Sequence, residues 1–211
     1  MRKSSTNRRA RGLQADAHTE VTTAVIIGCG LTGLAVASEL SRQGVESIVL
    51  NGLERDDSSS LQPVPDPGSL PERTELLRLL RGYAAGHELD IRRGTAARDL
   101  DLMRGTGIPA PVSRGLKWAI NTEEGVLLAD TVVLTGCGQP QLARLIRSLG
   151  FASVPQPRSA LRSAGLYLVG AGEAISAPTR ELVRQAKRAA QDIAARNAAH
   201  LSNPRLRTFS A

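Results

Sequence analysis

Short apolar runs alternate with amphipathic stretches along residues 21–199, and this alternation predicts strands and helices in turn. The runs that we assign to strands are 25–27, 47–50, 89–91, 131–134 and 166–169. Helices are predicted at 32–43, 72–85 and 176–198, where leucine or alanine recurs at helical spacing. In the last of these helices the apolar face consists of Leu182, Ala186, Ala189 and Ile193. The pattern therefore predicts an α/β, Rossmann-like fold with a mostly parallel sheet.

Residues 94–128 interrupt the alternation of strands and helices. Two apolar runs, 116–121 and 126–128, flank the sequence TEEG at 122–125, which is typical of a β-hairpin with glycine at its turn. We therefore expect a small antiparallel β excursion at 94–128 that leaves the parallel sheet and rejoins it.

The two ends of the chain lack this patterning. Residues 1–20 are polar and basic, with Arg2, Lys3, Arg8, Arg9 and Arg11 close together. Such a segment buries too little apolar surface to offset the entropy of ordering it. We therefore expect a disordered basic tail at 1–20, a single domain at 21–199, and a C-terminal tail at 200–211.

Composition narrows the classes of protein that this chain can represent. It has 211 residues, a formal net charge of +7 at pH 7 and 2% aromatic residues, and so few aromatics argue against a specific nucleic-acid partner despite the charge. Two cysteines and three histidines predict neither a disulfide framework nor a metal site. No apolar run approaches the roughly 20 residues of a membrane span. Residues 1–11 also lack the apolar core of a secretory signal, so we expect a cytoplasmic protein.

The sequence GCGLTG at 28–33 follows a predicted strand and opens a predicted helix, which is the context of a dinucleotide-binding turn. Gly28 permits the tight turn, Gly30 lets the backbone approach a pyrophosphate, and Gly33 lets helix and strand pack closely. Unpaired amides at the helix N-terminus favour phosphate groups. The predicted nucleotide-binding residues here are Gly28, Gly30, Leu31, Thr32 and Gly33.

The residue that follows the second predicted strand differs from the usual pattern. Dinucleotide-binding folds commonly carry an acid there that binds the ribose hydroxyls, whereas this chain has Asn51. Asn51 can accept one hydroxyl hydrogen bond but has no charge. Glu54 is a substitute acid if the strand end bends, and Arg55 permits a 2′-phosphate, as in NADP binding.

Six segments carry a family resemblance by their sequence and their order: 25–33, 70–95, 118–122, 129–136, 165–170 and 179–182. Together they resemble the FAD-binding half of the flavin-containing monooxygenase-like oxidoreductases, which are flavoproteins with two dinucleotide-binding domains. Among them, 129–136 is similar to the family's strand that ends in Ala-Thr-Gly.

This resemblance implies an FAD cofactor that lies across the strand ends. It assigns the pyrophosphate to Gly28, Gly30 and Gly33 and the adenosine ribose to Asn51. Further cofactor-binding residues implied at the later strand ends are Thr135, Gly136, Gly172 and Glu173. Glu173 stands where relatives often have aspartate.

One part of the family pattern is missing. Relatives insert a second module, for NADPH, after the Thr-Gly strand, but here about 30 residues separate Gly136 from the last predicted strand, less than one full βαβ unit. The resemblance therefore implies a reduced FAD domain without its own nicotinamide site. Its flavin is expected either to exchange a hydride with a small organic substrate or to accept electrons from a separate NAD(P)H-dependent reductase.

The leading expectation is a small, monooxygenase-like FAD-dependent oxidoreductase with a small organic substrate. The alternatives are a non-catalytic FAD-binding protein or subunit, and an NADP-binding reductase module. The sequence identifies no general base and leaves a homo-oligomer open. Cys29 and Cys137 are interpreted as small residues that fill tight turns; as a reactive thiol, Cys137 alone is a slightly better candidate than the pair. His87 is interpreted as a capping or surface residue. Four basic residues on the final helix are interpreted as a solvated face: Arg180, Arg184, Lys187 and Arg188.

Overall fold

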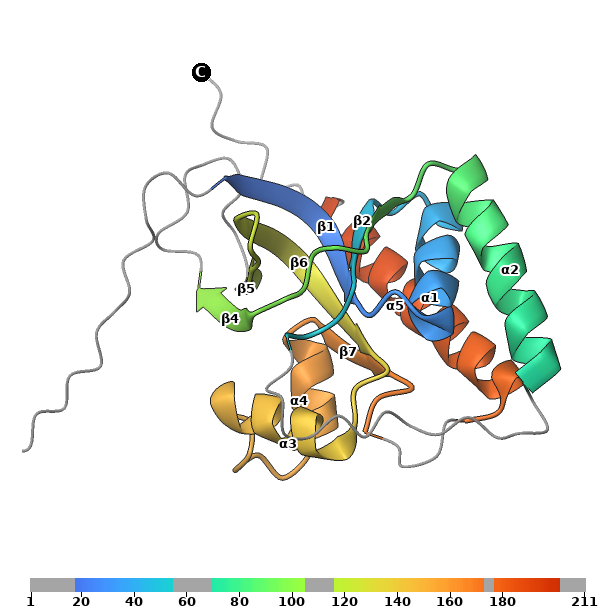
Figure 1. Cartoon of the computed structure of the whole chain (residues 1–211). Helices are drawn as coiled ribbons and strands as arrows, with labels where there is room; N and C mark the ends of the chain where they lie inside the picture. The colour runs from blue at the N-terminus through green and yellow to red at the C-terminus, as the bar shows by residue number, and fades with distance from the viewer. Residues whose placement is uncertain (1–17, 55–69, 105–115, 173–176, 202–211) are drawn as a thin grey trace, which may run out of the picture.

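In the part of the chain that the structure describes, residues 18–54, 70–104, 116–172 and 177–201 of a computed structural model, seven strands form one sheet. Their order is β3-β2-β1-β6-β5-β4, with β7 paired to β6 (Figure 1). The strands are β1 (Thr19–Ile27), β2 (Ser47–Leu50), β3 (Asp90–Arg92), β4 (Asp99–Arg104), β5 (Leu116–Asn121), β6 (Val126–Thr135) and β7 (Leu166–Val169).

The sheet has a parallel part and an antiparallel part. β3, β2, β1, β6 and β7 pair in parallel, whereas β4 and β5 are antiparallel to their neighbours. This arrangement confirms the α/β, Rossmann-like fold class that the sequence predicts.

Helices cover both faces of the sheet (Figure 1). One face carries α1 (Leu31–Arg42), α2 (Leu70–Gly86) and α5 (Thr179–Leu201), and the other carries α3 (Gln139–Ser148) and α4 (Pro157–Ser163). Helices α1 and α5 pack closely because both contribute small side chains to the core beneath them. These are Ala35 and Ala37 from α1 and Ala186, Ala189 and Ala190 from α5. The predicted apolar face of α5 is confirmed, since Leu182, Ala186, Ala189 and Ile193 are all buried.

The structure joins two predicted runs, 126–128 and 131–134, into the single strand β6. Asp130, the polar residue between them, forms an ion pair with Lys117 of β5. Since the pair offsets the charge of Asp130 within the sheet, the strand continues past this residue. β6 pairs with β5 through 126–129 and with β7 through 132–135. The antiparallel strands β4 and β5 are therefore joined to the parallel part of the sheet through β6, which confirms the small antiparallel β excursion that the sequence predicts.

Three elements of the structure have no counterpart in the predictions. β4 pairs with β5 along its whole length, while α3 and α4 fill the link between β6 and β7. β1 begins at Thr19 and α5 ends at Leu201, whereas the predicted domain runs from 21 to 199. The remaining tail residues, 1–17 and 202–211, lie outside the described residues. Among the helices that are described, none has the length and apolar character needed to span a membrane.

Candidate functional site

The carboxyl ends of four neighbouring strands place the predicted nucleotide-binding residues at one edge of the sheet. Ile27 of β1 lies opposite Leu50 of β2 and Leu134 of β6, and Thr135 of β6 lies opposite Val169 of β7. The next residues, Gly28, Asn51, Gly136 and Gly170, therefore leave the sheet side by side. Ligands of open α/β sheets bind at this carboxyl edge.

Two glycines of the 28–33 turn have no room for a side chain. Gly28 has φ +121°, and a Cβ there would lie 2.3 Å from Thr135 Oγ1. A Cβ on Gly33 would lie 1.7 Å from the carbonyl oxygen of Gly28. The turn and the first turn of α1 are in backbone contact, as the predicted roles of Gly28 and Gly33 require.

Gly30 has the opposite environment. Among the residues that the structure describes, none beyond its two chain neighbours has an atom within 4 Å of the place that the Cβ of residue 30 would occupy, and Gly30 is the N-cap of α1. The amides of Leu31, Thr32 and Gly33 have no carbonyl four residues earlier within the helix. The first turn of α1 also contains no acidic residue that would compete for them. The open space beside these donors fits a pyrophosphate, so the residues present fit FAD at this point.

Thr135 faces the glycine turn. Its hydroxyl lies 3.2 Å from the carbonyl oxygen of Ile27 and 3.3 Å from that of Gly28, and it donates to this pair. Thr135 is buried, with 7% of its surface exposed. Its side chain therefore links the end of β6 to the turn that follows β1.

Asn51 is held beside the same turn. The backbone N–H of Asn51 donates to the backbone carbonyl oxygen of Thr95 at 2.9 Å. The backbone carbonyl oxygen of Asn51 accepts from the backbone N–H of Cys29 at 3.3 Å. The Cys29 thiol donates to Asn51 Oδ1 at 3.2 Å. No local pattern predicts this contact between Cys29 and Asn51, because the two residues are 22 positions apart in the chain.

Glu54, the substitute acid of the sequence analysis, is directed elsewhere. Its amide donates to the carbonyl oxygen of Ala97 at 2.7 Å, and its carboxylate lies 3.2 Å from Nε of Arg98. Glu54 is thus tied to the segment before β4. Arg55 lies outside the described residues.

The three remaining predicted site residues, Gly136, Gly172 and Glu173, differ in their surroundings. Gly136 has φ +63° and open space at its Cβ position, so a ligand can approach it. Gly172 serves packing: a Cβ there would lie 2.6 Å from Leu142 Cδ2 of α3, and its amide donates to the carbonyl oxygen of Cys137 at 2.7 Å. Glu173 lies outside the described residues, and its role stays a prediction.

Two residues at this edge were missed by the sequence analysis. Gln185 of α5 accepts a hydrogen bond from the amide of Gly170 at 3.3 Å through Oε1. Arg73 of α2 donates to the carbonyl oxygen of Ala177, just before α5, at 3.1 Å. Both contacts join segments that are distant in sequence, so no local signal announced them.

Cys137 does not support the expectation of a reactive thiol. It is 3% exposed and packs in the core beneath α3 and α4. Burial raises the pKa of its thiol to about 11, which leaves little thiolate at neutral pH. His87, directly after α2, is exposed and stacks on Tyr83 with 4.0 Å between ring centroids, in agreement with its interpretation as a capping or surface residue.

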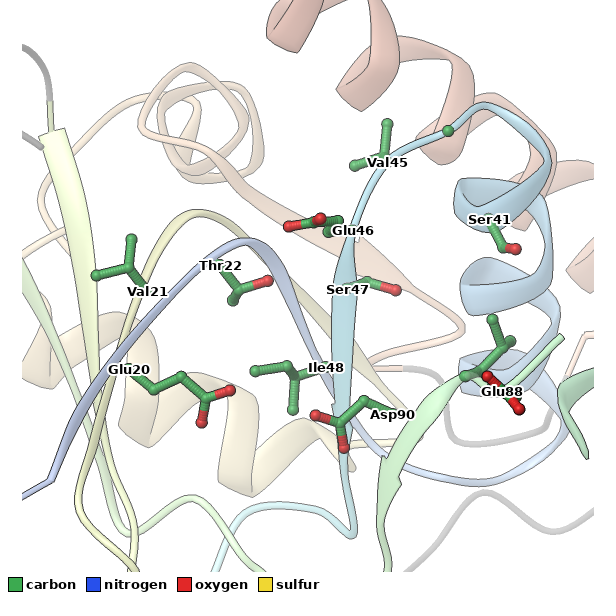
Figure 2. A pocket seen from close by; sticks show the side chains of 12 residues that line it. Glu20, Val21, Thr22, Ser41, Val45, Glu46, Ser47, Ile48, Glu88 and Asp90 are labelled. Atoms are coloured by element: carbon green, nitrogen blue, oxygen red, sulfur yellow. The ribbon is translucent and has the colours of Figure 1, made fainter.

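A cavity of about 480 Å³ lies at the opposite, amino edge of the strands (Figure 2). Glu20 of β1, Glu46 before β2, and Glu88 and Asp90 around the start of β3 line it. Arg92 forms ion pairs with Glu20 at 2.8 Å and with Asp90 at 2.7 Å. The hydrogen bond from Arg92 lowers the pKa of Glu20.

Nowhere in the described segments do His, Cys, Asp and Glu side chains gather in a group that could hold a metal ion.

A family model described as an FAD binding domain matches residues 20–64. The matched stretch contains β1, the glycine turn, α1 and β2. This part of the chain is similar to an FAD-binding domain. A search of curated proteins gives no match.

Solved structures resemble this chain over different shares of its length. THI4 of Thermovibrio ammonificans is 17% identical, with a TM-score of 0.55 over 84% of this chain and 90% of that one. The anhydrotetracycline hydroxylase OxyS of Streptomyces rimosus is 20% identical, with a TM-score of 0.40 over 61% of this chain and 34% of its own. Thioredoxin reductase of T. acidophilum is 22% identical, with a TM-score of 0.39 over 56% and 36%. The likeness to THI4 supports the Rossmann-like fold.

Proposed function

We propose that this chain binds FAD at the carboxyl edge of its sheet and acts as a small, monooxygenase-like FAD-dependent oxidoreductase. Its substrate would be a small organic molecule, with electrons supplied by a separate NAD(P)H-dependent reductase. The observation that carries the proposal is the open space at Gly30, bounded by the closed turn of Gly28 and the free amides of α1. The match of residues 20–64 to an FAD-binding model supports the choice of cofactor.

Different residues of the carboxyl edge would bind different parts of FAD. The amides of Leu31, Thr32 and Gly33 donate to the pyrophosphate, where the positive end of the α1 dipole adds to the attraction. Asn51 contacts the adenosine ribose, and Gly136 leaves room for the cofactor beside β6. When bound, FAD supplies the electron or hydride transfer, and the protein supplies position and a dry environment.

The decisive experiment is reconstitution of the purified protein with FAD. We expect a yellow protein whose flavin absorbance persists after gel filtration and is released by boiling. Bleaching by NADPH, with and without an added reductase, then separates an oxidoreductase from a non-catalytic flavin protein. A colourless protein that binds NADP instead would point to the reductase-module alternative, and a protein indifferent to both nucleotides would overturn the proposal.

The two cysteines offer a test of where the cofactor lies. Cys29 is partly exposed in the glycine turn, whereas Cys137 is buried. Bound FAD is expected to slow alkylation of Cys29 by iodoacetamide, as measured by peptide mass spectrometry. Cys137 is the internal control, because it should react slowly with or without FAD. Equal alkylation of Cys29 in both samples would place FAD elsewhere.

A further inference from the structure

We propose that the adenosine-ribose end of this site accepts adenine nucleotides both with and without a 2′-phosphate, and that the Cys29–Asn51 pair is the reason. The inference rests on the proposed nucleotide site and goes beyond it, because it adds 2′-phosphorylated adenine nucleotides to its ligands. Three features of the carboxyl edge support it.

The first feature is the fixed position of Asn51. Both of its backbone polar groups are bonded, the amide to Thr95 at 2.9 Å and the carbonyl oxygen to Cys29 at 3.3 Å. The side chain therefore begins directly beside the glycine turn, at the end of β2. This is the place from which a dinucleotide fold contacts the ribose hydroxyls.

The second feature is the direction of the Asn51 amide group. The thiol of Cys29 lies 3.2 Å from Oδ1 and donates to it, so Nδ2 is the group left for a ligand. Nδ2 carries two hydrogens and can donate to a ribose hydroxyl oxygen or equally to a phosphate oxygen. A carboxylate at this place would accept from both hydroxyls and repel a 2′-phosphate.

The third feature is the state of the neighbouring acids. Glu54 lies 3.2 Å from Arg98, and Arg98 also pairs with Glu123 at 2.5 Å. Glu124 accepts a hydrogen bond from the Thr95 hydroxyl at 2.6 Å. Each of these three carboxylates thus has a donor from the protein, and none replaces the missing acid at the end of β2.

The experiment compares ADP-ribose with 2′-phospho-ADP-ribose by calorimetry, since the two probes differ only at the 2′ position. We expect dissociation constants within about fivefold of each other for the wild-type protein. Asn51→Asp places a carboxylate at the end of β2. It should change the ratio of the two dissociation constants by at least about tenfold in favour of ADP-ribose. Cys29→Ala leaves Asn51 Oδ1 free to accept from a ribose hydroxyl, so it should shift the ratio towards ADP-ribose, by less than Asn51→Asp because it adds no charge. An unchanged ratio in Cys29→Ala would overturn the role of the Cys29–Asn51 pair.

Asn197→Asp, near the C-terminal end of α5, is the matched control for the added charge, because it should leave the ratio as in the wild type. Discrimination of more than about fiftyfold against the 2′-phosphate in the wild type would overturn the inference. So would an unchanged ratio in a folded Asn51→Asp variant. Both results leave FAD binding intact and so spare the proposed function. If FAD and both probes fail to bind, the proposed function falls, and this inference falls with it.

Discussion

At the carboxyl edge of the sheet, the glycines after β1 and β6 and the first amides of α1 lie beside open space. The cavity at the amino edge is lined by four carboxylates (Figure 2). The carboxyl edge presents donors and the positive end of a helix dipole, which attract anions. The amino edge presents Glu20, Glu46, Glu88 and Asp90, which repel them. The chemistry of the lining groups thus decides which edge of this sheet can bind a phosphate. The size of a cavity does not decide it.

The two edges also differ in what holds them together. At the carboxyl edge, the contacts are between backbone atoms and leave no room for a Cβ at Gly28 or Gly33. At the amino edge, Arg92 joins Glu20 and Asp90 through exposed or partly exposed side chains. Steric contacts in a packed interior are costly to change, whereas exposed ion pairs contribute little. Substitutions at the two edges should therefore have very different effects.

The largest effect is expected for Gly33→Ala. Its new Cβ would lie 1.7 Å from the Gly28 carbonyl oxygen, so α1 must move away from the turn. We expect the free energy of unfolding to fall by about 3 kcal/mol or more. Urea unfolding followed by fluorescence of Trp118, the single tryptophan of the chain, measures it. Gly82→Ala is the control: this helical glycine of α2 has open space, and alanine should stabilise by about 0.5–1 kcal/mol. Equal stability of the two variants would contradict the close contact between Gly33 and the carbonyl oxygen of Gly28.

Gly30→Val separates ligand binding from folding at the same turn. Gly30 has φ −75° and ψ −170°, which valine tolerates, so stability should change by less than about 0.5 kcal/mol. The side chain would fill the open space beside α1, and the dissociation constant for FAD should rise at least about tenfold. A fluorescence titration with FAD measures it. Gly82→Val, in open space on α2, should leave FAD affinity unchanged. Wild-type affinity in Gly30→Val would place the pyrophosphate elsewhere.

Thr135→Val tests whether the end of β6 shapes the turn. Valine removes the hydroxyl that bonds the carbonyl oxygens of Ile27 and Gly28. We expect a loss of about 1 kcal/mol in stability and about fivefold weaker FAD binding. Thr135→Ser keeps the hydroxyl and should restore the affinity. Thr131→Val removes another buried hydroxyl of β6 and should affect stability alone. If Thr131→Val weakens FAD binding as much, the effect is not specific to the turn.

Arg92→Met should have the smallest effect, at the amino edge. We expect a loss of about 1 kcal/mol or less at pH 7 and no change in FAD affinity. The hydrogen bond from Arg92 lowers the pKa of Glu20 in the folded protein, so the stabilisation is present at neutral pH and is lost as the pH falls through that lowered value. Urea unfolding at several pH values should show the two proteins converging in acid. A stability difference between wild type and Arg92→Met that grows in acid would contradict the role given to the ion pair between Arg92 and Glu20. A loss of FAD binding in Arg92→Met would contradict the placement of FAD at the carboxyl edge.

How far the sequence could predict the structure depended on whether each signal was local. The strands 47–50, 116–121 and 166–169 have the predicted bounds, because each apolar run lies between turn residues. β6 was divided into two because Asp130 is polar, and only its ion pair with Lys117 shows why the strand continues. α3 was not predicted, although Leu142, Leu145 and Ile146 stand at helical spacing and Pro140 lies in its first turn, so its sequence does contain a local helix signal.

By itself, the sequence determined the Rossmann-like class and the glycine turn, because backbone sterics at Gly28 and Gly33 act within a few residues. It also predicted that Asn51 follows β2. The tertiary structure alone decided that Thr135 faces the turn, that Cys29 donates to Asn51, and that Glu54 joins Arg98. These contacts link residues from separate strands and loops, and their partners are set by how the strands pair and not by any local pattern.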